Sequence, residues 1–314
     1  MSKPRALRVV YGETLARLGG ELPDVVVLDA DLSKSTKTAI FAKQYPERFM
    51  EMGIAEQDMV STAAGLAAGG LTPFCSTFAI FATGRAWDQL RNSVCYPNLN
   101  VKLVATHGGI TVGQDGGSHQ AVEDLAVTRV IPNLRVIVPA DPMETEQVIE
   151  TIARLDGPFY VRLPRGKTAD VHPQGWRFEL GKATELRAGA DVTLAACGLM
   201  VGLALAAAEE LAAAGVDARV LNVSTLKPLD VETLSRAARE TGALVTLEEH
   251  SVIGGLGSAV CEALSGCCPV PVLRLGVQDQ FGQSGTADEL LEHYGLTVEK
   301  AVEMAREAVA LKER

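Results

Sequence analysis

Three features of the sequence predict an α/β fold with two domains. Short apolar runs rich in β-branched residues alternate with longer segments of helical composition, which is typical of parallel sheets flanked by helices. The expected strands are almost continuously apolar, as in sheets that are covered on both faces. The alternation stops near residue 170 and restarts near residue 188, so the 314 residues divide into two domains of ordinary size.

The first expected domain covers residues 1–170. Its strands are predicted at five apolar runs: Val25–Asp29, Leu71–Ser76, Val101–Thr106, Arg135–Pro139 and Phe159–Leu163. Its helices are predicted between them: Val9–Leu18, Ala55–Gly69, Ala79–Cys95 and Pro142–Leu155. Strands separated by helices indicate parallel pairing, because each helix returns the chain to the same end of the sheet.

An interdomain linker is expected at residues 171–187, where glycine and proline interrupt the alternation and no period is clear. The second domain, residues 188–314, repeats the pattern. Its predicted strands are Val192–Cys197, Arg219–Val223, Ala243–Glu248 and Val270–Leu275. Its predicted helices are Leu199–Ala214 and Asp230–Thr241, the first of which is rich in strong helix formers.

Composition and charge exclude several classes of partner. Hydrophobic residues make up 47% and charged residues 22%, which is typical of a soluble globular protein. The net charge of −10 argues against nucleic acid and anionic membranes. No apolar run is long enough to span a bilayer, no secretory signal is evident, and the six cysteines include no C-x-x-C pair. We therefore expect a cytoplasmic protein with reduced thiols.

The most informative segment is the glycine-rich stretch from His107 to Gln120, which follows a predicted strand. It contains five glycines, Asp115 and two of the five histidines, His107 and His119. In open α/β sheets ligands bind beyond the carboxyl ends of strands, and histidine is suited to proton transfer near neutral pH. A zinc site is the rival interpretation, but the two histidines are twelve residues apart and no cysteine accompanies them.

Two earlier segments are ambiguous when taken alone. Glu56 in Gly53-Ile54-Ala55-Glu56-Gln57 stands in the first turn of a predicted helix, where the helix dipole alone favours a carboxylate. Aromatic residues at helical spacing are more often core residues than ligand contacts, and on the residues alone this is the default for Phe74 and Phe81. The helix after Glu56 has a run of small residues, Ala63 to Gly70, which favours close packing against another element, including one of a second chain.

Two further segments have competing interpretations. In Val161-Arg162-Leu163-Pro164-Arg165-Gly166, an arginine could bind phosphate or form a surface ion pair. Gly254-Gly255-Leu256-Gly257 follows Glu248-Glu249-His250 and resembles a dinucleotide-binding turn. No matching acidic residue follows a further strand about twenty positions on, so we do not expect NAD binding.

Taken together, these segments resemble the transketolase family over nearly the whole chain. Asp29-Ala30-Asp31-Leu32-Ser33, the Glu56 segment, Ser76-Thr77-Phe78, the His107–Gln120 loop and Pro139-Ala140-Asp141 occur in the family's order and spacing. The resemblance continues to Phe281-Gly282-Gln283-Ser284-Gly285. It implies a pyrimidine-binding domain for thiamine diphosphate, followed by a transketolase C-terminal-like domain used mainly in assembly.

The resemblance also implies roles for individual residues. Glu56 is implied to bond N1′ of the aminopyrimidine and Phe78 to stack on that ring, with Asp31 and Phe81 as further cofactor contacts. His107 and His119 are implied to be catalytic and, with Asp115, to line the sugar channel. The implied sugar-phosphate ligands are Ser35, Arg8 and Arg165. No residue of this chain is implied to bind a metal.

One part of the family's site is missing. Family members bind the diphosphate and a divalent cation through a G-D-G motif followed by an asparagine, and this sequence contains no G-D-G. We therefore expect the C-terminal half of a split transketolase, active only with an N-terminal subunit that carries that motif and Mg²⁺ or another divalent cation. The expected assembly is an α2β2 heterotetramer, partly formed by self-association of this chain, which transfers a two-carbon ketol unit between sugar phosphates.

Three alternatives remain open from the sequence. A beta subunit of a 2-oxoacid dehydrogenase has a similarly placed glutamate, although the His107–His119 loop resembles transketolase instead. A half of a 1-deoxyxylulose-5-phosphate synthase shares the Glu56 and Phe78 segments. A catalytically silent scaffold subunit would keep the fold alone, against which the intact Glu56, His107, Asp115 and His119 count.

Overall fold

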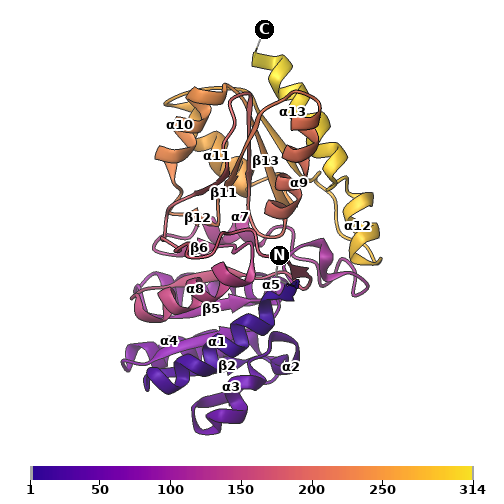
Figure 1. Cartoon of the computed structure of the whole chain (residues 1–314). Coiled ribbons are helices and arrows are strands. Elements are labelled where there is room, and N and C mark those ends of the chain that lie inside the picture. The colour runs from indigo at the N-terminus through magenta and orange to yellow at the C-terminus, as the bar shows by residue number, and fades with distance from the viewer. Residues whose placement is uncertain (1–2, 313–314) are drawn as a thin grey trace.

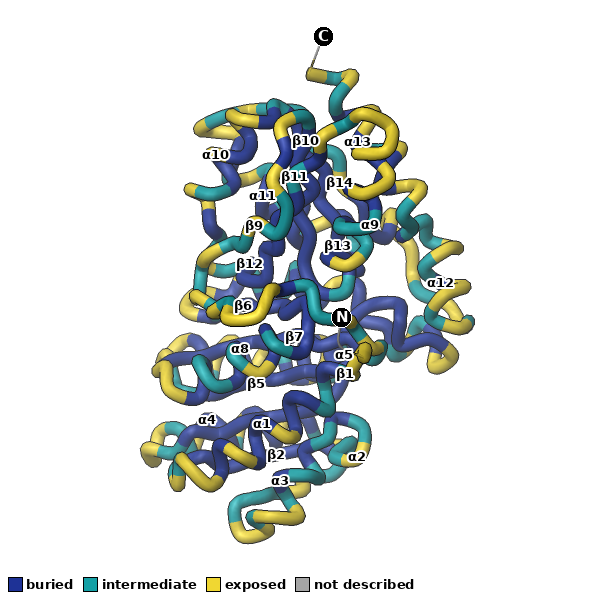
Figure 2. Tube along the Cα trace, viewed as in Figure 1, coloured by how far each residue is buried: buried dark blue, intermediate teal, exposed yellow. Residues whose placement is uncertain are grey.

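The computed structural model describes residues 3–312, and in these residues the chain forms two stacked α/β halves, as predicted. Figure 1 shows the first half below and the second half above, with helices beside each sheet. The strands in the middle of each half are buried, and exposed residues gather on the outer helices and loops (Figure 2).

The first half is built on a seven-stranded sheet with the order β12-β6-β7-β5-β4-β2-β3. All pairs in it are parallel except β12 with β6. The strands from the first half are β2 (Val25–Asp29), β3 (Phe49–Glu51), β4 (Thr72–Ser76), β5 (Lys102–Ala105), β6 (Arg135–Ile137) and β7 (Phe159–Arg162). Strands β2, β4, β5 and β7 are buried at every residue, which explains their continuous apolar runs.

Helices cover both faces of this sheet. They are α1 (Leu7–Glu21), α2 (Ser33–Thr36), α3 (Ala39–Gln44), α4 (Glu56–Ala68), α5 (Ala79–Gly84), α6 (Trp87–Gln89), α7 (Asp124–Arg129) and α8 (Pro142–Arg154), with 3-10 turns at Pro46–Arg48 and Ile110–Val112. Helix α8 begins where the sequence indicates, because the Asp141 side chain accepts a hydrogen bond from Glu144 N and Pro142 occupies the first turn.

One predicted helix is wrong. The segment expected as a continuous helix, Ala79–Cys95, is divided into α5, α6 and a π-helical turn at Leu90–Cys95. The break lies at Gly84 and Arg85, and the Arg85 carbonyl accepts a hydrogen bond from Gln57 Nε2 at 3.2 Å. A contact with another helix therefore replaces a regular helical turn at this point.

The second half has a five-stranded sheet with the order β14-β13-β10-β11-β9, parallel except for β9. Its strands are β9 (Thr184–Arg187), β10 (Val192–Ala196), β11 (Ala218–Asn222), β13 (Leu244–Ser251) and β14 (Val272–Val277). Its helices are α9 (Met200–Ala213), α10 (Val231–Thr241), α11 (Leu256–Ser265), α12 (Ala287–His293) and α13 (Val298–Lys312).

The two halves are joined more closely than the sequence indicates. Strand β12 (Thr225–Lys227) leaves the second half and pairs with β6, and β8 (Lys167–Thr168) pairs with β1 (Arg5–Ala6). The last four residues of the expected linker, 184–187, form strand β9. Earlier in the same linker, His172 is buried, with its Nδ1 2.8 Å from Asp141 Oδ2. The segment between the halves is therefore packed along much of its length.

Candidate active site

Glu56 is the first residue of α4 and lies beside a surface cavity of about 700 Å³. Its side chain is only 4% exposed, and its Oε1 pairs with Arg85 Nη1 at 2.8 Å. The exposed Ile54 and Asp58 line the same cavity. A buried carboxylate at the edge of an open cavity can release the Arg85 guanidinium and accept a hydrogen bond from a ligand instead.

Arg85 links this carboxylate to a cluster of four aromatic rings. Arg85 stacks over the Phe81 ring at 4.1 Å, and Phe81 lies 5.8 Å from the Phe78 ring. Phe78 in turn stacks on His107, with ring centroids 3.8 Å apart. His119 meets Phe81 edge-on at 5.3 Å. Predicted residues from three separate segments are thus in one continuous cluster.

Neighbouring strands of the sheet bring Phe78 and His107 together. Phe78 follows β4 and His107 follows β5, and the backbone continues to pair beyond both strands, with Ala79 N donating to Thr106 O at 2.8 Å. The two rings therefore lie at the carboxyl edge of the sheet, where ligands bind in this fold class. Phe81 is half-buried in the cluster, so the interpretation of it as a simple core residue is wrong.

His107 is held in an unusual conformation and is uncharged at neutral pH. Its φ of 60° lies in the left-handed region, and its Nδ1 is 2.7 Å from Thr106 Oγ1. Burial, with the nearby cations Arg8 and Arg165 and His119, lowers the pKa of His107 to about 3. The ring is therefore a neutral imidazole, in which one nitrogen donates and the other accepts a hydrogen bond.

Two of the three predicted phosphate ligands, Arg8 and Arg165, lie at a second cavity of about 380 Å³, and Ser35 does not line it. Arg8 and Arg165 both line it, together with Gly113 and Gln114 of the glycine-rich loop. Arg8 Nη1 donates to the Ser35 carbonyl at 2.9 Å, and Arg165 Nη1 is 3.3 Å from Asp115 Oδ2. Partial burial, together with the charge of Arg165, lowers the pKa of Arg8. Two guanidinium groups that line one cavity are suited to an anionic ligand.

Asp31 is not part of either cluster. It is exposed, and its backbone N–H donates to Glu51 Oε1 at 2.7 Å. The buried carboxylate of this segment is Asp29, which accepts from Leu32 N and from Thr36 and Thr38 hydroxyls at 2.7 Å. Asp29 therefore stabilises the turn that presents Ser35, and a cofactor contact for Asp31 stays a prediction from resemblance.

Beneath the glycine-rich loop lies a buried ionic network. Arg162 Nε pairs with Asp124 Oδ2 at 2.9 Å, and Tyr160 donates to the same oxygen at 2.7 Å. Arg162 also donates to the backbone carbonyls of Ala121 and Glu249. Of the two arginines in its segment, Arg162 is thus in a buried ion pair, while Arg165 forms an exposed ion pair with Asp115 and lines the cavity with Arg8.

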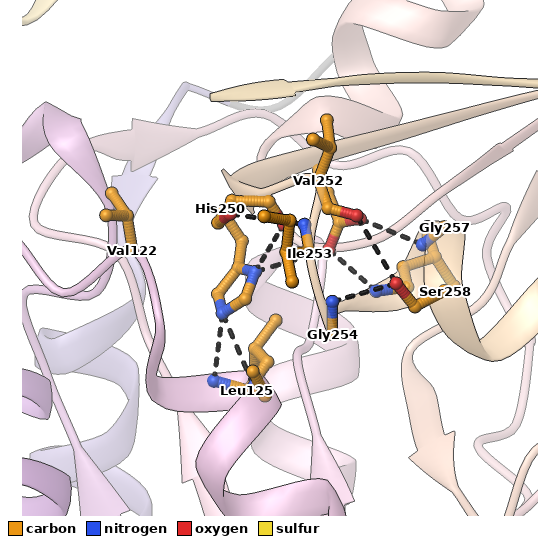
Figure 3. A network of polar contacts seen from close by, with 12 residues as sticks. Val122, Leu125, His250, Val252, Ile253, Gly254, Gly257 and Ser258 are labelled. Atoms are coloured by element: carbon orange, nitrogen blue, oxygen red, sulfur yellow. Dashed lines mark hydrogen bonds and ion pairs between the residues drawn. The ribbon is translucent and has the colours of Figure 1, made fainter. Parts of the chain in front are cut away.

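Strand β13 contributes the three side chains of Glu248-Glu249-His250 to this region. His250 Nδ1 donates to the Ser251 carbonyl, and its Nε2 accepts from the N–H groups of Leu125 and Ala126 at the start of α7, as Figure 3 shows. Because Nε2 accepts, this histidine is neutral. A residue of the second half therefore caps a helix of the first half.

Glu248 explains the glycine-rich turn at residues 254–257. Its two carboxylate oxygens accept from Leu256 N at 2.6 Å and Gly257 N at 2.8 Å, at the start of α11. A Cβ at Gly255 would lie 2.0 Å from Glu248 Oε2, so the turn closes directly around the carboxylate. The helix N-terminus is thus occupied by a side chain of the protein itself.

The sequence interpretation missed Arg85, Glu249 and the partner of Arg162. Only Arg85 had a local signal, since it stands just beyond the Phe78–Phe81 segment; the other two depend on contacts between segments far apart in the chain.

Among residues 3–312, no three His, Cys, Asp or Glu side chains are arranged to hold a metal ion. None of the helices in this part of the chain is long and apolar enough to cross a membrane. All six cysteines are free.

Comparison with protein families agrees with this architecture. Residues 3–170 match the pyrimidine binding domain of transketolase, and residues 181–301 match the transketolase C-terminal domain. The fold and site therefore define a member of the transketolase family. Within that family, the chain is similar to C-terminal sections of split-gene transketolases, as three relatives indicate.

A protein of Methanocaldococcus jannaschii, provisionally named a transketolase C-terminal section, is 50% identical over 295 residues, which are 93% of this chain and 92% of the relative. A 6-deoxy-6-sulfo-D-fructose transketolase subunit of Clostridium sp. is 45% identical and aligns over 98% of this chain and 95% of its own. A solved split gene transketolase, described as an inactive beta4 tetramer, is 53% identical with a TM-score of 0.92, covering 98% and 99% of the two chains.

Proposed function

We propose that this chain is the C-terminal subunit of a thiamine-diphosphate-dependent transketolase that transfers a two-carbon ketol unit from a ketose to an aldose. The observation that carries the proposal is the continuous set of contacts from Glu56 through Arg85, Phe81 and Phe78 to His107. It joins a carboxylate and aromatic rings, suited to a heteroaromatic cofactor, to a histidine loop suited to a sugar.

The residues fit the aminopyrimidine end of the cofactor. A carboxylate that is almost fully buried beside an open cavity can share a proton with a ring nitrogen, and we assign that contact to Glu56. We assign stacking on the ring to Phe78, with Phe81 as a further contact. When bound, thiamine diphosphate supplies the carbon nucleophile of ketol transfer; the chain supplies binding and orientation.

Sugar recognition falls to the glycine-rich loop and the arginine pair. Neutral His107 and the partly exposed His119 can donate and accept hydrogen bonds with hydroxyl groups. Asp115 accepts hydrogen bonds from such groups in the same loop. Arg8 and Arg165, with Ser35 next to them, are suited to the phosphate of a sugar phosphate.

A partner subunit completes the proposed enzyme. The diphosphate end of the cofactor needs a divalent cation such as Mg²⁺, with oxygen ligands, and we assign these to an N-terminal transketolase subunit. The Clostridium relative is named a subunit, and the split gene tetramer is described as inactive. Exposed apolar side chains near the site, Ile54 at 74% and Phe281 at 90%, are suited to a subunit interface.

The proposed assembly is an α2β2 heterotetramer in the cytoplasm, with contacts between copies of this chain. The small-residue segment of α4 contributes less to this interface than its composition indicates, because Ala63 and Ala64 are buried in the chain's own core. Gly65, Ala68 and Gly69 remain exposed on the same helix.

Glu56→Gln in the reconstituted enzyme tests the proposal. Glutamine keeps the size of the side chain but cannot share the proton, so ketol transfer should fall by at least about a hundredfold, as for loss of a general acid–base group, while circular dichroism stays unchanged. Glu209→Gln, at an exposed position of α9 that does not line the cavity, is the control and should leave turnover unchanged. Near-normal turnover by Glu56→Gln would refute the assignment.

A second candidate comes from relatives of another activity. A 1-deoxy-D-xylulose-5-phosphate synthase of Pelotomaculum thermopropionicum is 41% identical over 96% of this chain, although the chain covers only 48% of that enzyme. Donor assays with the reconstituted pair separate the two candidates. A ketose phosphate donor supports transketolase, and a 2-oxoacid donor with release of CO₂ supports the alternative.

A further inference from the structure

The backbone that follows His107 is held by a carboxylate from the other half of the chain. Glu249 in β13 accepts a hydrogen bond at Oε1 from the backbone N–H of Thr111, at 2.6 Å. Glu249 is only 3% exposed, and its Oε2 has no hydrogen-bond partner among the described residues. The contact spans 138 positions in sequence, so the second half directly restrains the glycine-rich loop.

The loop lies too close to this network for side chains at its start. A Cβ at Gly109, whose φ is +87°, would be 2.3 Å from Glu249 Cδ. A Cβ at Gly108 would be 2.5 Å from Arg162 Nε. Two glycines directly after His107 therefore allow the loop to rest on Glu249 and Arg162.

This support is needed because His107 has a conformation that is costly for a residue with a side chain. Its φ of 60° persists only where the surroundings fix the backbone on both sides. On one side β5 fixes it, and Thr106 N donates to Thr77 O at 3.1 Å. On the other side Gly108 N donates to Leu163 O at 3.2 Å and Gly109 N to Ala121 O at 2.8 Å, and Glu249 adds the hold on Thr111.

Two charged groups act on the Glu249 carboxyl. Arg162, which donates to the Glu249 backbone carbonyl at 2.8 Å, lowers its pKa, and Asp124 raises it. Burial raises the pKa of Glu249 to about 7, against the opposing effect of Arg162. Above pH 7, where Glu249 is ionised, its carboxylate makes a shorter and stronger hydrogen bond to an N–H group than a neutral acceptor does.

We propose that Glu249 is a positioning residue for the sugar-binding loop, which holds segment 108–111 and thereby sets the position of His107. The second domain is then part of the active site as well as of the assembly. The sugar-binding role of the loop rests on the proposed function; the anchoring itself does not.

Amide hydrogen exchange in the isolated full-length chain tests the anchor without requiring activity. Glu249→Ala removes the acceptor, so protection of the Thr111 amide should fall at least tenfold. At pH 8, where wild-type Glu249 is ionised, Glu249→Gln keeps the side-chain volume but provides a neutral acceptor, so protection should fall threefold to tenfold. If the alanine variant does not fold, the glutamine variant decides alone.

Glu248 provides the matched control on the neighbouring residue. It is also buried and also accepts from backbone N–H groups, but these belong to α11. Glu248→Gln should lower protection of Leu256 and Gly257 and leave Thr111 unchanged. Wild-type protection of Thr111 in Glu249→Gln, or equal loss of it in Glu248→Gln, would overturn the proposal.

A kinetic readout links the anchor to function. In the reconstituted enzyme, Glu249→Gln should lower kcat/KM for the ketose at least fivefold while leaving thiamine diphosphate affinity within twofold, because Glu56 and Phe78 do not touch Glu249. An equal effect on cofactor affinity would contradict a specific role at the sugar loop. Absence of ketol transfer in the wild type would refute the proposed function and leave the exchange experiment to judge the anchor.

Discussion

The buried carboxyl of Glu249 should make the stability of this protein depend on pH in a defined direction. Its pKa is raised by burial from an ordinary value of 4.5 to about 7 in the folded chain. Between pH 4.5 and about pH 7 the folded state therefore keeps the Glu249 carboxyl protonated, whereas the unfolded state has released that proton. The stabilising contribution is complete below pH 4.5 and is lost as the pH rises through 7.

The size of the effect follows from the two pKa values. Their difference, at about 1.4 kcal/mol per pH unit, corresponds to about 3 kcal/mol in total, of which roughly 2 to 3 kcal/mol is lost between pH 5 and pH 8. Glutamine does not titrate, so Glu249→Gln removes this dependence. The free energy of unfolding of Glu249→Gln minus that of the wild type should therefore rise by roughly 2 to 3 kcal/mol between pH 5 and pH 8.

Urea unfolding of the isolated chain at a series of pH values measures this difference. Exposed Glu209 in α9 is the control position, and Glu209→Gln should give a nearly constant difference from wild type. A constant difference for Glu249→Gln between pH 5 and pH 8 would show that Glu249 titrates normally. At alkaline pH, Glu249→Gln should therefore raise the free energy of unfolding relative to wild type. The same variant should lower the protection of the Thr111 amide from hydrogen exchange, so the two quantities should change in opposite directions.

Two further predictions concern the ionic contacts. Asp124→Asn should lower the free energy of unfolding by about 3 kcal/mol, because it leaves the buried Arg162 with an incomplete set of partners; a loss below about 1 kcal/mol in urea unfolding would contradict this. Arg165→Ala should raise KM for a ketose phosphate about tenfold but leave KM for the unphosphorylated ketose unchanged, with exposed Arg5→Ala as the control; equal effects on both sugars would refute a phosphate contact.

The sequence was sufficient for the α/β class and for most strands, because the central strands are buried on both faces and therefore read as continuous apolar runs. It was also sufficient to bring Phe78 and His107 to one edge of the sheet, since both follow strands that pair in parallel. Helix boundaries were less predictable. The break at Arg85 depends on a hydrogen bond from Gln57, which no local pattern reveals.

The contacts between the halves could not be read from the sequence. Strand β12 has three residues and pairs with a strand about ninety positions earlier, so it leaves no period of its own. The Glu248-Glu249-His250 segment resembles an ordinary strand end, yet its three side chains cap α11, hold Thr111 and cap α7. Such roles depend on the tertiary structure, which sequence spacing alone does not contain.

The most direct test of the proposed function is cofactor binding measured by calorimetry, with and without the partner. This chain should bind thiamine diphosphate and Mg²⁺ weakly on its own, because the proposed function assigns Glu56 and Phe78 to the aminopyrimidine and the diphosphate site to an N-terminal subunit. Addition of a subunit carrying the G-D-G…N motif should produce tight, stoichiometric binding and ketol transfer. Tight stoichiometric binding together with ketol transfer by the purified chain alone would contradict the split-enzyme account.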